Sequence, residues 1–334
     1  MRHINIPVFI PHLGCPNQCV FCNQRSISGV SEFRSDNVRK IIDDALLTIP
    51  QDAEVEIAFF GGSFTGIDSE LMIDLLQIGK SYIDAGVVAS LRCSTRPDYI
   101  DENIISILKQ YGVRTIELGL QSISDKVLEN TKRGHYFQAE ESACKLIVNS
   151  GLNLVGQMMI GLPGADVQSE LDTARFIINA GARGARIYPT VVFRDTELCN
   201  MTLCESYQPL SIDEAVARSA AVFGLFVDAG VEVIRIGLQS SDGLIGEDTY
   251  VGGPNHPALG ELVIGEYFYE KIEKAISGVE ISEDTEIKIV VPRGSLSKVV
   301  GHNKKNKTRL MEKYRKIKFV ESDGLSNYEI AVET

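Results

Sequence analysis

The feature that most constrains this chain is a regular alternation of apolar and amphipathic stretches over its first two thirds. Short runs rich in β-branched and apolar residues are typical of buried strands, and the stretches between them have helical periodicity. Because the strands are apolar on both faces, we expect parallel βα units with helices covering the sheet. The predicted strands are 4–10, 55–60, 88–93, 115–120, 152–160 and 185–192, and the predicted helices are 35–48, 69–85, 101–110, 138–150, 167–179 and 211–229.

Six such units are fewer than the eight of a complete TIM barrel. They favour an α/β fold built as a partial (β/α)6 TIM-like barrel, with functional residues at the C-terminal ends of the strands. Beyond residue 235 the pattern loosens into a Gly- and Pro-rich segment (239–260), a helix (261–277) and a small β-α-β stretch (285–320). We therefore predict a barrel at 1–235, an extension at 236–280 and a small α+β subdomain at 281–334.

The composition narrows the class of protein further. The chain has 334 residues, of which 44% are hydrophobic, as expected for a soluble globular protein. No window reaches the ~18 continuous apolar residues of a membrane span, and the first residues do not have the pattern of a signal peptide. Seven cysteines without a disulfide-like framework favour metal ligation or core packing. These observations predict a cytoplasmic protein that does not associate with membranes.

The strongest chemical motif is a cysteine loop directly after the first predicted strand. Cys15, Cys19 and Cys22 lie close enough in sequence for one loop to carry all three thiols. Three soft thiolates can hold three irons of a [4Fe–4S] cluster and leave the fourth iron open to a reactant. Phe21 would then cover one face of the cluster. The alternatives are a zinc site, for which a second close pair of ligands is absent, or three buried cysteines.

A second motif follows the second predicted strand. Gly61, Gly62 and Ser63 place two glycines at a strand end, where the backbone can approach a ligand closely. A Gly-Gly turn after a strand is common, so this motif gains weight only in combination with others.

Taken together, the motifs resemble the radical S-adenosylmethionine (SAM) superfamily. Within it, the chain is similar to the radical domain of the Elongator catalytic subunit and its short bacterial relatives, over about residues 4–265. It is more distantly similar to oxygen-independent coproporphyrinogen oxidases. The landmarks after the cysteine triplet occur in order as Gly61 to Phe64, Ser94 to Asp98, Glu117 to Ser122, Arg133 to His135, Gly161 to Gly164, and Arg186 to Pro189.

The resemblance implies a SAM site built from several strand ends. Gly61, Gly62 and Ser63 match positions that contact the methionine amine of SAM. Gln121 and Arg133 match positions that bind its ribose and carboxylate region. A guanidinium group such as that of Arg133 also suits a carboxylate on chemical grounds, because its N–H groups form a fork.

Four further positions complete the implied site. Gln157 matches a position that faces the ribose, and Ile187 and Tyr188 would line the adenine side. Ser94 stands where many relatives carry an acid, so this chain differs at one ribose contact. For each of these polar residues the alternative is a side chain satisfied locally at a strand end.

The implied reaction is reductive cleavage of SAM at the cluster to a 5′-deoxyadenosyl radical, which abstracts a hydrogen from a substrate. An electron donor such as flavodoxin or ferredoxin is implied as a partner. The leading substrate class is RNA, with modification of a tRNA base as the expected outcome. The alternatives are a small-molecule or porphyrin-type substrate, or a non-catalytic Fe–S redox protein. The sequence shows no counterpart of the Elongator acetyltransferase domain, so that group transfer is not carried over.

A basic segment near the C-terminus contrasts with the rest of the chain. The net charge is −12, but residues 287–319 hold eleven Lys and Arg and one acid, so the segment is +10 and the remainder −22. Its centre loosely resembles a KH module, in which a glycine-bearing loop between helices clamps nucleic acid. The predicted phosphate contacts are Lys304, Lys305, Lys307 and Arg309. The alternative is a docking subdomain with a solvated basic face.

The remaining candidates are single residues. His256 lies in a Gly- and Pro-rich loop and is either a substrate contact or a structural hydrogen-bonding residue. Cys199 and Cys204 are either ligands of a second cluster or ordinary thiols of a helical region. Cys93 and Cys144 are predicted core residues.

Overall fold

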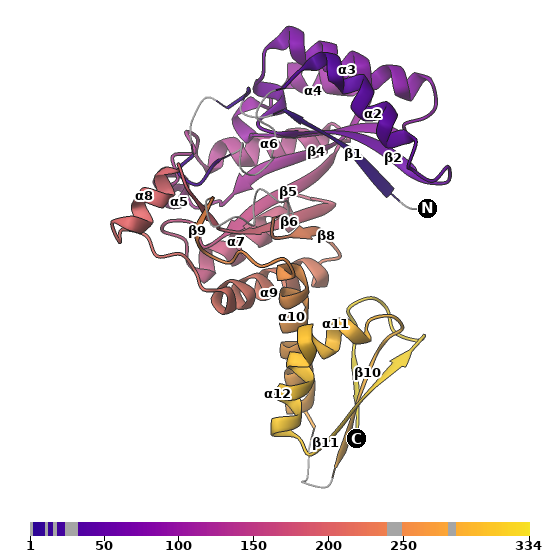
Figure 1. Ribbon diagram of the computed structural model, residues 1–334, viewed down its shortest axis with the longest axis vertical. Helices are drawn as coiled ribbons and strands as arrows, with labels where there is room; N and C mark the ends of the chain where they lie inside the picture. The colour runs from indigo at the N-terminus through magenta and orange to yellow at the C-terminus, as the bar shows by residue number, and fades with distance from the viewer. Residues whose placement is uncertain (1–2, 11–12, 16–18, 24–32, 239–248, 280–284) are drawn as a thin grey trace.

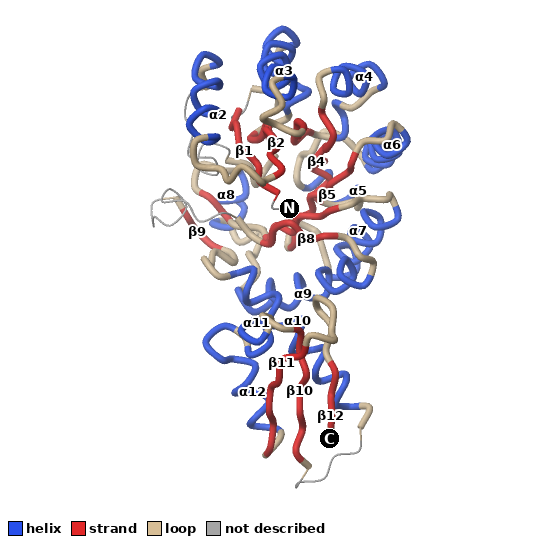
Figure 2. Tube along the Cα trace, turned by 90° about the vertical axis from the view of Figure 1, so that its right-hand side faces the viewer, coloured by secondary structure: helices blue, strands red, loops and turns tan. Residues whose placement is uncertain are grey.

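The computed structural model describes residues 3–10, 13–15, 19–23, 33–238, 249–279 and 285–334. Seven parallel strands form one curled sheet in the order β1-β2-β3-β4-β5-β6-β8 (Figures 1 and 2). Each strand therefore lies beside the preceding strand of the sheet. The bounds are β1 His3–Ile10, β2 Glu54–Gly61, β3 Ser90–Thr95, β4 Val113–Gln121, β5 Asn153–Ile160, β6 Gly184–Pro189 and β8 Glu232–Ile236.

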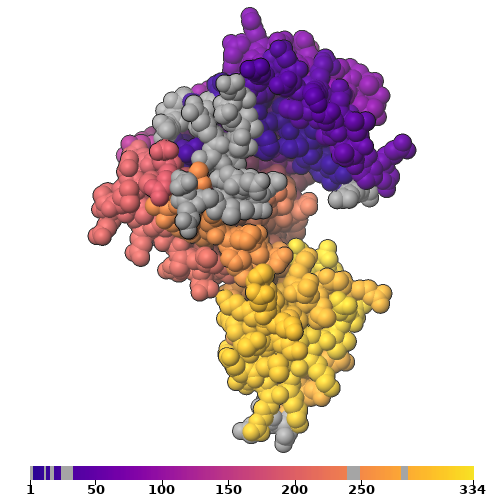
Figure 3. Space-filling model, viewed as in Figure 1, coloured from indigo at the N-terminus to yellow at the C-terminus, as the bar shows by residue number. Residues whose placement is uncertain are grey.

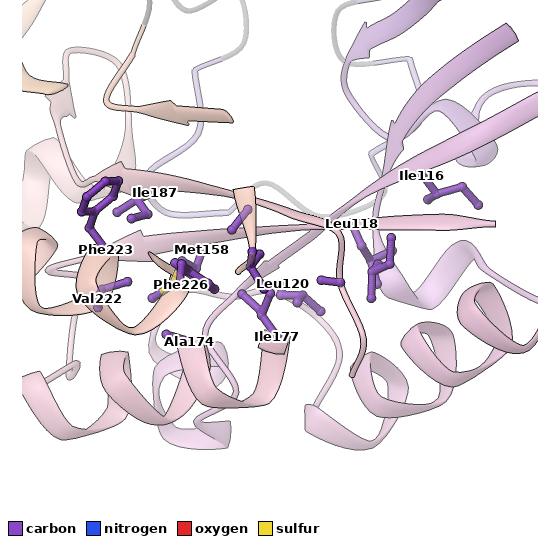
Figure 4. Packing of buried hydrophobic residues seen from close by; sticks show 14 of the residues in the cluster. Ile116, Leu118, Leu120, Met158, Ala174, Ile177, Ile187, Val222, Phe223 and Phe226 are labelled. Atoms are coloured by element: carbon purple, nitrogen blue, oxygen red, sulfur yellow. The ribbon is translucent and has the colours of Figure 1, made fainter. Parts of the chain in front are cut away.

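Helices cover the outer face of this sheet (Figure 2). Alternate strand residues point outward and pack against them, as Ile116, Leu118 and Leu120 of β4 do in Figure 4. All three side chains are fully buried. The covering helices are α2 Val38–Leu46, α3 Ser69–Asp84, α4 Glu102–Gln110, α6 Phe137–Asn149, α7 Val167–Asn179 and α9 Ile212–Asp228.

The predicted partial barrel is confirmed, but the sequence prediction missed one described strand of its sheet. All six predicted strands are present, and β8 pairs with β6 as a seventh. β8 is short and carries Glu232 and Arg235, and none of its residues is fully buried. An edge strand of this kind lacks the apolar run by which the other strands were recognised. Two short helices at the strand ends were also missed, α5 Asp125–Asn130 and α8 Glu197–Leu203.

Beyond the sheet, α10 (Leu259–Ser277) leads from the barrel into a small lobe (Figures 1 and 3). The lobe contains a sheet in the order β11-β10-β12, with β10 parallel to β11 and antiparallel to β12. Part of the predicted Gly- and Pro-rich segment, residues 239–248, lies outside the described residues. The lobe elements are β10 Glu286–Pro292, α11 Leu296–Val300, a 3-10 turn His302–Lys304, α12 Lys305–Lys313, β11 Lys316–Ser322 and β12 Ala331–Glu333.

An aromatic cluster joins the lobe to the barrel. Phe223 of α9 meets Tyr267 of α10 with ring centres 5.2 Å apart, and meets Tyr328, which precedes β12, at 5.3 Å. Tyr328 also lies 6.1 Å from Phe268. The first two contacts are edge-to-face and the third is stacked, and both arrangements add to the stabilisation that burial provides. α10 thus packs against both parts of the molecule. None of the helices in the described part is long and apolar enough to span a membrane.

Candidate active site at the barrel mouth

The cysteine loop begins in direct backbone contact with the loop after β2. A Cβ atom added to Gly14 would lie 1.9 Å from the carbonyl oxygen of Ser63. One added to Gly66 would lie 2.4 Å from the carbonyl oxygen of Gly14. Such distances exclude any side chain at either position. The two motifs recognised separately in the sequence therefore form one structural unit.

Cys19 is buried between two arginines. The Arg133 Nη1 group donates a hydrogen bond to Cys19 Sγ at 3.3 Å, and Arg96 Nη1 approaches the same sulfur at 3.9 Å. Both guanidinium groups therefore place positive charge next to this sulfur. The next residue fixes the loop, because the Val20 N–H donates to Thr131 O and the Val20 carbonyl accepts from Leu198 N.

Cys15 and Cys22 are half-buried and have different surroundings. Burial raises the pKa of the Cys15 thiol, against the lowering influence of the Ser63 backbone and Arg96. The Cys22 N–H donates to Cys19 O at 3.0 Å. Within the described residues, no three His, Cys, Asp or Glu side chains are gathered as a metal-binding group, and loop residues 16–18 lie outside that description.

A cavity of about 640 Å³ opens beside this loop. It lies against the segment that enters α8, and the Phe21 side chain packs nearby against the apolar cluster that contains Val192 and Leu198. The lining residues are Cys19, Cys22, Arg194, Asp195, Thr196, Glu197, Cys199 and Asn200.

Two threonines fix the loop after β2 to the end of β3. The Ser63 hydroxyl lies 2.8 Å from Thr95 Oγ1, which lies 2.6 Å from Thr65 Oγ1. The Arg96 N–H also donates to Ser63 Oγ at 3.3 Å. Ser63 is 1% exposed. Its hydroxyl is therefore engaged in positioning its own loop, and the backbone of this loop is the part that remains to meet a ligand.

Arg96 is held in place by an ionic network in which Arg96, His135 and Glu140 are buried and Asp98 lies at the surface. Asp98 accepts two hydrogen bonds from it, at 2.9 and 2.8 Å, and Asp98 also pairs with His135 at 3.5 Å. His135 Nε2 lies 3.2 Å from Glu140 Oε1, and Glu140 is fully buried. The landmark containing Arg96 and Asp98 therefore contacts the landmark containing Arg133 and His135. The order of these motifs along the chain does not indicate this contact.

The network shifts the pKa of each of its acids and of its histidine. Burial would raise the pKa of Asp98, but hydrogen bonds from His135 and Arg96 outweigh it and hold that pKa well below its usual range. Burial lowers the pKa of His135, but its bonds to Asp98 and Glu140 outweigh this and raise the pKa. Burial raises the pKa of Glu140 to about 7, although its bond to His135 opposes the shift.

Gln121 and Arg133 carry polar atoms that suit a ligand. Gln121 ends β4 with a left-handed φ of 69°, where the pairing of β4 with β5 shifts register. Arg133 Nη2 donates to Gly119 O at 2.6 Å. Gln121 Oε1 and Arg133 Nε are buried and have no hydrogen-bond partner among the described residues. An unsatisfied buried polar atom costs about 1–3 kcal/mol, which a bound polar ligand would offset.

The inner face of the barrel below the mouth is polar rather than apolar. Glu117 is fully buried and accepts hydrogen bonds from Arg92, Gln157 and Arg186, each at 2.9 Å. Arg92 also donates to Glu56 on β2 at 2.9 Å. The chain of ion pairs therefore joins β2 to β6 across the barrel. The sequence prediction missed it, although charged residues at alternate positions of otherwise apolar strands carried the signal.

The remaining predicted SAM-binding residues lie on two different faces of the sheet. Ser94 and Tyr188 are half-exposed on the inner face, and Gln157 bonds to Glu117 there. Ile187 is fully buried and packs on the opposite face, beneath the helices, near Met158 and Phe223 in Figure 4. This placement removes the Ile187 side chain from the predicted pocket, because alternate residues of a strand point to opposite faces.

The other single-residue candidates have structural surroundings. His256 Nδ1 accepts from the Ala258 N–H at the start of α10, and its ring packs on His302 of the lobe at 5.8 Å. Cys93 and Cys144 are core residues as predicted, and burial raises the pKa of each to about 12.

The two candidates for a second cluster, Cys199 and Cys204, differ in exposure. Cys199 is buried beside Val192 and Leu198, and Cys204 is exposed. No metal-binding group that includes either of them occurs among the described residues.

A parallel partial barrel with a three-cysteine loop after β1, and arginines gathered on one of those thiols, defines an enzyme fold suited to a metal cofactor at its mouth. Residues 9–177 match the Radical SAM superfamily, and residues 182–269 match the Radical_SAM C-terminal domain. The chain therefore belongs to the radical SAM superfamily and is an enzyme of that superfamily. Its cofactors are a [4Fe–4S] cluster and SAM, as in the family.

Two curated relatives point to the Elongator group. The chain is 31% identical over 183 residues to the tRNA uridine(34) acetyltransferase of Methanocaldococcus jannaschii. The matched region covers 49% of the chain and 34% of that protein. It is 34% identical over 134 residues to Homo sapiens Elongator complex protein 3, covering 38% of the chain and 24% of that protein. The chain thus matches about a third or less of the length of these relatives.

A solved structure supports the fold. The Elp3 protein of Methanocaldococcus infernus, with residues 1–46 deleted, superposes with a TM-score of 0.62 at 22% identity. The superposition covers 83% of this chain and 64% of that one. The curled sheet and its helical cover are therefore shared with that protein.

Proposed function

We propose that this protein reductively cleaves SAM and uses the resulting radical chemistry to modify RNA, with tRNA as the leading substrate. The observation that carries the proposal is the convergence of two buried arginines on Cys19, beside the backbone contact of the cysteine loop with the loop after β2. This arrangement brings together a metal-ligating thiol and groups suited to an anionic ligand.

Cys15, Cys19 and Cys22 are the proposed ligands of the cluster. The donor set is three thiols on a short loop, and two guanidinium groups next to Cys19 supply positive charge where an anionic cluster would lie. When bound, the cluster and SAM supply a one-electron cleavage that yields a carbon-centred radical. The protein residues contribute by holding the loop, excluding water and placing charge.

The proposed SAM site lies on the neighbouring strand ends. Arg133 Nε and Gln121 Oε1 are buried without partners, which supports a role in holding the carboxylate and ribose region. Gly61 and Gly62 would offer backbone groups to the methionine amine. Tyr188 and Ser94 would face the remainder of the molecule from the inner surface of the barrel. The Asp98 and His135 pair keeps Arg96 oriented toward Cys19.

RNA is the proposed substrate for two reasons. The relatives that the chain resembles in sequence include a tRNA uridine(34) acetyltransferase and Elongator complex protein 3. In addition, the C-terminal lobe concentrates positive charge in a chain that is otherwise acidic, and exposed lysines suit a phosphate backbone. A donor such as flavodoxin or ferredoxin would supply the electron.

The test is an anaerobic assay of the cluster-loaded protein with SAM, a chemical reductant and bulk tRNA. Formation of 5′-deoxyadenosine and methionine is expected, together with a change in the nucleoside composition of the tRNA. The matched control is Cys204→Ala, which removes an exposed thiol outside the proposed ligand set. Absence of SAM cleavage would reject the catalytic proposal, and cleavage with unchanged tRNA would reject the substrate.

A further inference from the structure

The cations of the basic segment differ in their surroundings, and two groups of them are compared first. One group forms ion pairs with acids of the helices that carry the lobe. Lys305 lies 3.2 Å from Asp213 at the start of α9, and Arg309 lies 2.6 Å from Glu266 of α10. The Arg309 guanidinium also lies 3.5 Å from the centre of the Tyr269 ring. Lys305 and Arg309 therefore fix the lobe to the rest of the protein.

The second group consists of Lys298, Lys304 and Lys307. All three are exposed, and no acid among the described residues forms an ion pair with them. They come from three consecutive elements, α11, the 3-10 turn and α12, so the connecting turn brings them into one region of the lobe. Within an acidic protein, an unpaired cluster of lysines is a surface that attracts polyanions.

The turn between α11 and α12 has an unusual backbone. Gly301 has φ 82°, and Asn303 and Lys304 follow with φ 52° and 62°. A lysine in the left-handed region is strained, and glycine would relieve the strain. Lys304 stands at the fourth position of the turn, where a KH-type G-x-x-G loop carries its second glycine. Strain of this kind persists where the surrounding structure imposes it and is concentrated at functional sites.

The buried Asn306 imposes this backbone. Its side-chain nitrogen donates to Gly265 O of α10 at 2.7 Å and to Val299 O of α11 at 3.0 Å. A Cβ atom on Gly301 would lie 2.9 Å from Asn306 Cγ, so the turn is packed closely on this amide. The turn is therefore preorganised, and the Lys304 ammonium group is presented from a fixed backbone.

We infer that the turn of residues 301–304, with Lys298, Lys304 and Lys307 around it, is the surface that holds the phosphate backbone of RNA. This inference rests on the proposed function, since it assigns the lobe a part in binding that substrate. It also redistributes the predicted contacts, because Lys305 and Arg309 serve docking and Lys298 joins the binding group.

The experiment compares two triple variants that lose the same charge from the same lobe. Lys298→Ala with Lys304→Ala and Lys307→Ala removes the proposed surface. Lys288→Ala with Arg293→Ala and Lys318→Ala removes three cations that are paired with acids of the lobe. Binding of the full-length, cluster-loaded protein to bulk tRNA is measured by fluorescence anisotropy over a series of salt concentrations.

The first triple variant is expected to bind about tenfold or more weakly, with the slope of log affinity against log salt reduced by about 2 to 3, since each lost phosphate contact removes ~0.7–0.9. The control triple should bind as the wild type does. Equal binding by the two triples would overturn the inference while leaving the proposed reaction intact. If the wild type does not bind tRNA, both the inference and the RNA substrate fail, and SAM cleavage measured in parallel shows whether the enzyme proposal survives.

A single variant separates binding from folding. Lys304→Gly relieves the left-handed strain, so the midpoint of thermal unfolding should stay the same or rise, while tRNA binding weakens by several-fold. Unchanged tRNA binding by this variant would contradict the inference. Vesicles of phosphatidylcholine with phosphatidylserine serve as the second probe. If the wild type binds them more tightly than tRNA and loses that binding in the first triple, the surface recognises membranes and the RNA inference is wrong.

Discussion

The arginines of the barrel mouth and the lysines of the lobe illustrate two uses of positive charge. Arg96 and Arg133 are nearly inaccessible to solvent and are positioned by Asp98, by His135 or by backbone carbonyls. Lys304 and Lys307 are exposed and have no acidic partner among the described residues. The two buried arginines have a fixed geometry, whereas the side chains of the two exposed lysines can adjust to a bound polyanion.

This difference matches the ligands that each region is proposed to bind. A fixed guanidinium in a dry site can recognise a single carboxylate, because interactions there are strong and weakly screened by salt. Exposed lysines bind weakly one by one and are screened by salt, but they can follow the repeated charges of a nucleic-acid backbone.

The largest effect should come from the cysteine loop. Replacing Cys22 with Ala removes one of three proposed ligands, so iron incorporation and formation of 5′-deoxyadenosine should both be abolished. Iron analysis and an anaerobic SAM-cleavage assay measure these outcomes. The exposed Cys204 provides the control, and Cys204→Ala should behave as the wild type. Full SAM cleavage by the Cys22→Ala variant would show that the ligand assignment is wrong.

The next effect concerns recognition of SAM. Arg133→Ala should weaken SAM binding by about tenfold to a hundredfold, because a hydrogen bond to a charged group contributes about 1.5–3 kcal/mol. Binding is measured by equilibrium dialysis with the cluster-loaded protein, and iron content is checked in the same sample. Arg175→Ala, which removes an exposed arginine of α7, is the control. Equal SAM affinity in the two variants would contradict the proposed role of Arg133.

A smaller effect should appear as a pH dependence of stability. Burial raises the pKa of Glu140 from 4.5 to about 7, so the folded protein holds a proton that the unfolded chain releases in this range. The associated stability is complete below pH 4.5 and is lost as the pH rises through about 7. The shift of the His135 pKa, also upward, acts in the same direction.

Glu140→Gln keeps a neutral side chain and should flatten this dependence. Between pH 5 and pH 8 the unfolding free energy of the wild type should fall by about 1–3 kcal/mol more than that of the variant. Denaturant unfolding at several pH values measures it. Glu141→Gln, at the exposed neighbouring position, should follow the wild-type curve. Parallel curves for wild type and Glu140→Gln would contradict the assignment.

The smallest expected effects are changes in the free energy of unfolding when cations of the lobe are replaced. These changes should differ between the docking cations and the exposed cations. Arg309→Ala loses a stacking contact with Tyr269 and an ion pair with Glu266, so it should destabilise the protein by about 1–2 kcal/mol. Lys307→Ala should change stability by less than about 0.5 kcal/mol. Chemical denaturation measures both. Equal destabilisation by the two variants would remove the distinction between docking and exposed cations.

The sequence predicted the barrel well because its apolar, β-branched runs alternate regularly with stretches of helical periodicity. The expectation that the strands are apolar on both faces was wrong, since the inner face carries Arg92, Glu117 and Arg186. The six predicted strands of the main sheet were found, and among the described strands of that sheet β8, short and with charged residues, was missed. The contacts at the mouth were harder to predict. Nothing in the spacing of Arg96 and His135 along the chain indicates that both meet near Cys19, since the folding of separate βα units brings them together.

The lobe shows a different limit of sequence reasoning. Charge counting identified the basic segment, but it treated Lys304, Lys305, Lys307 and Arg309 as equivalent. Only the placement of Asp213 and Glu266 on helices far away in sequence divides them into two groups. Likewise, Ile187 packs beneath the helices because it lies on the outer face of its strand. The sequence motif that contains Ile187 does not indicate this face.

Nucleoside mass spectrometry of tRNA tests the proposed tRNA modification most directly. The tRNA comes from cells that carry the wild-type gene or the Cys15→Ala, Cys19→Ala, Cys22→Ala triple variant. The variant chain should be produced at the wild-type level, which immunoblotting checks. We predict that at least one modified nucleoside present with the wild type is absent with the variant and is replaced by its precursor. Identical nucleoside profiles in the two strains would contradict the proposed tRNA modification.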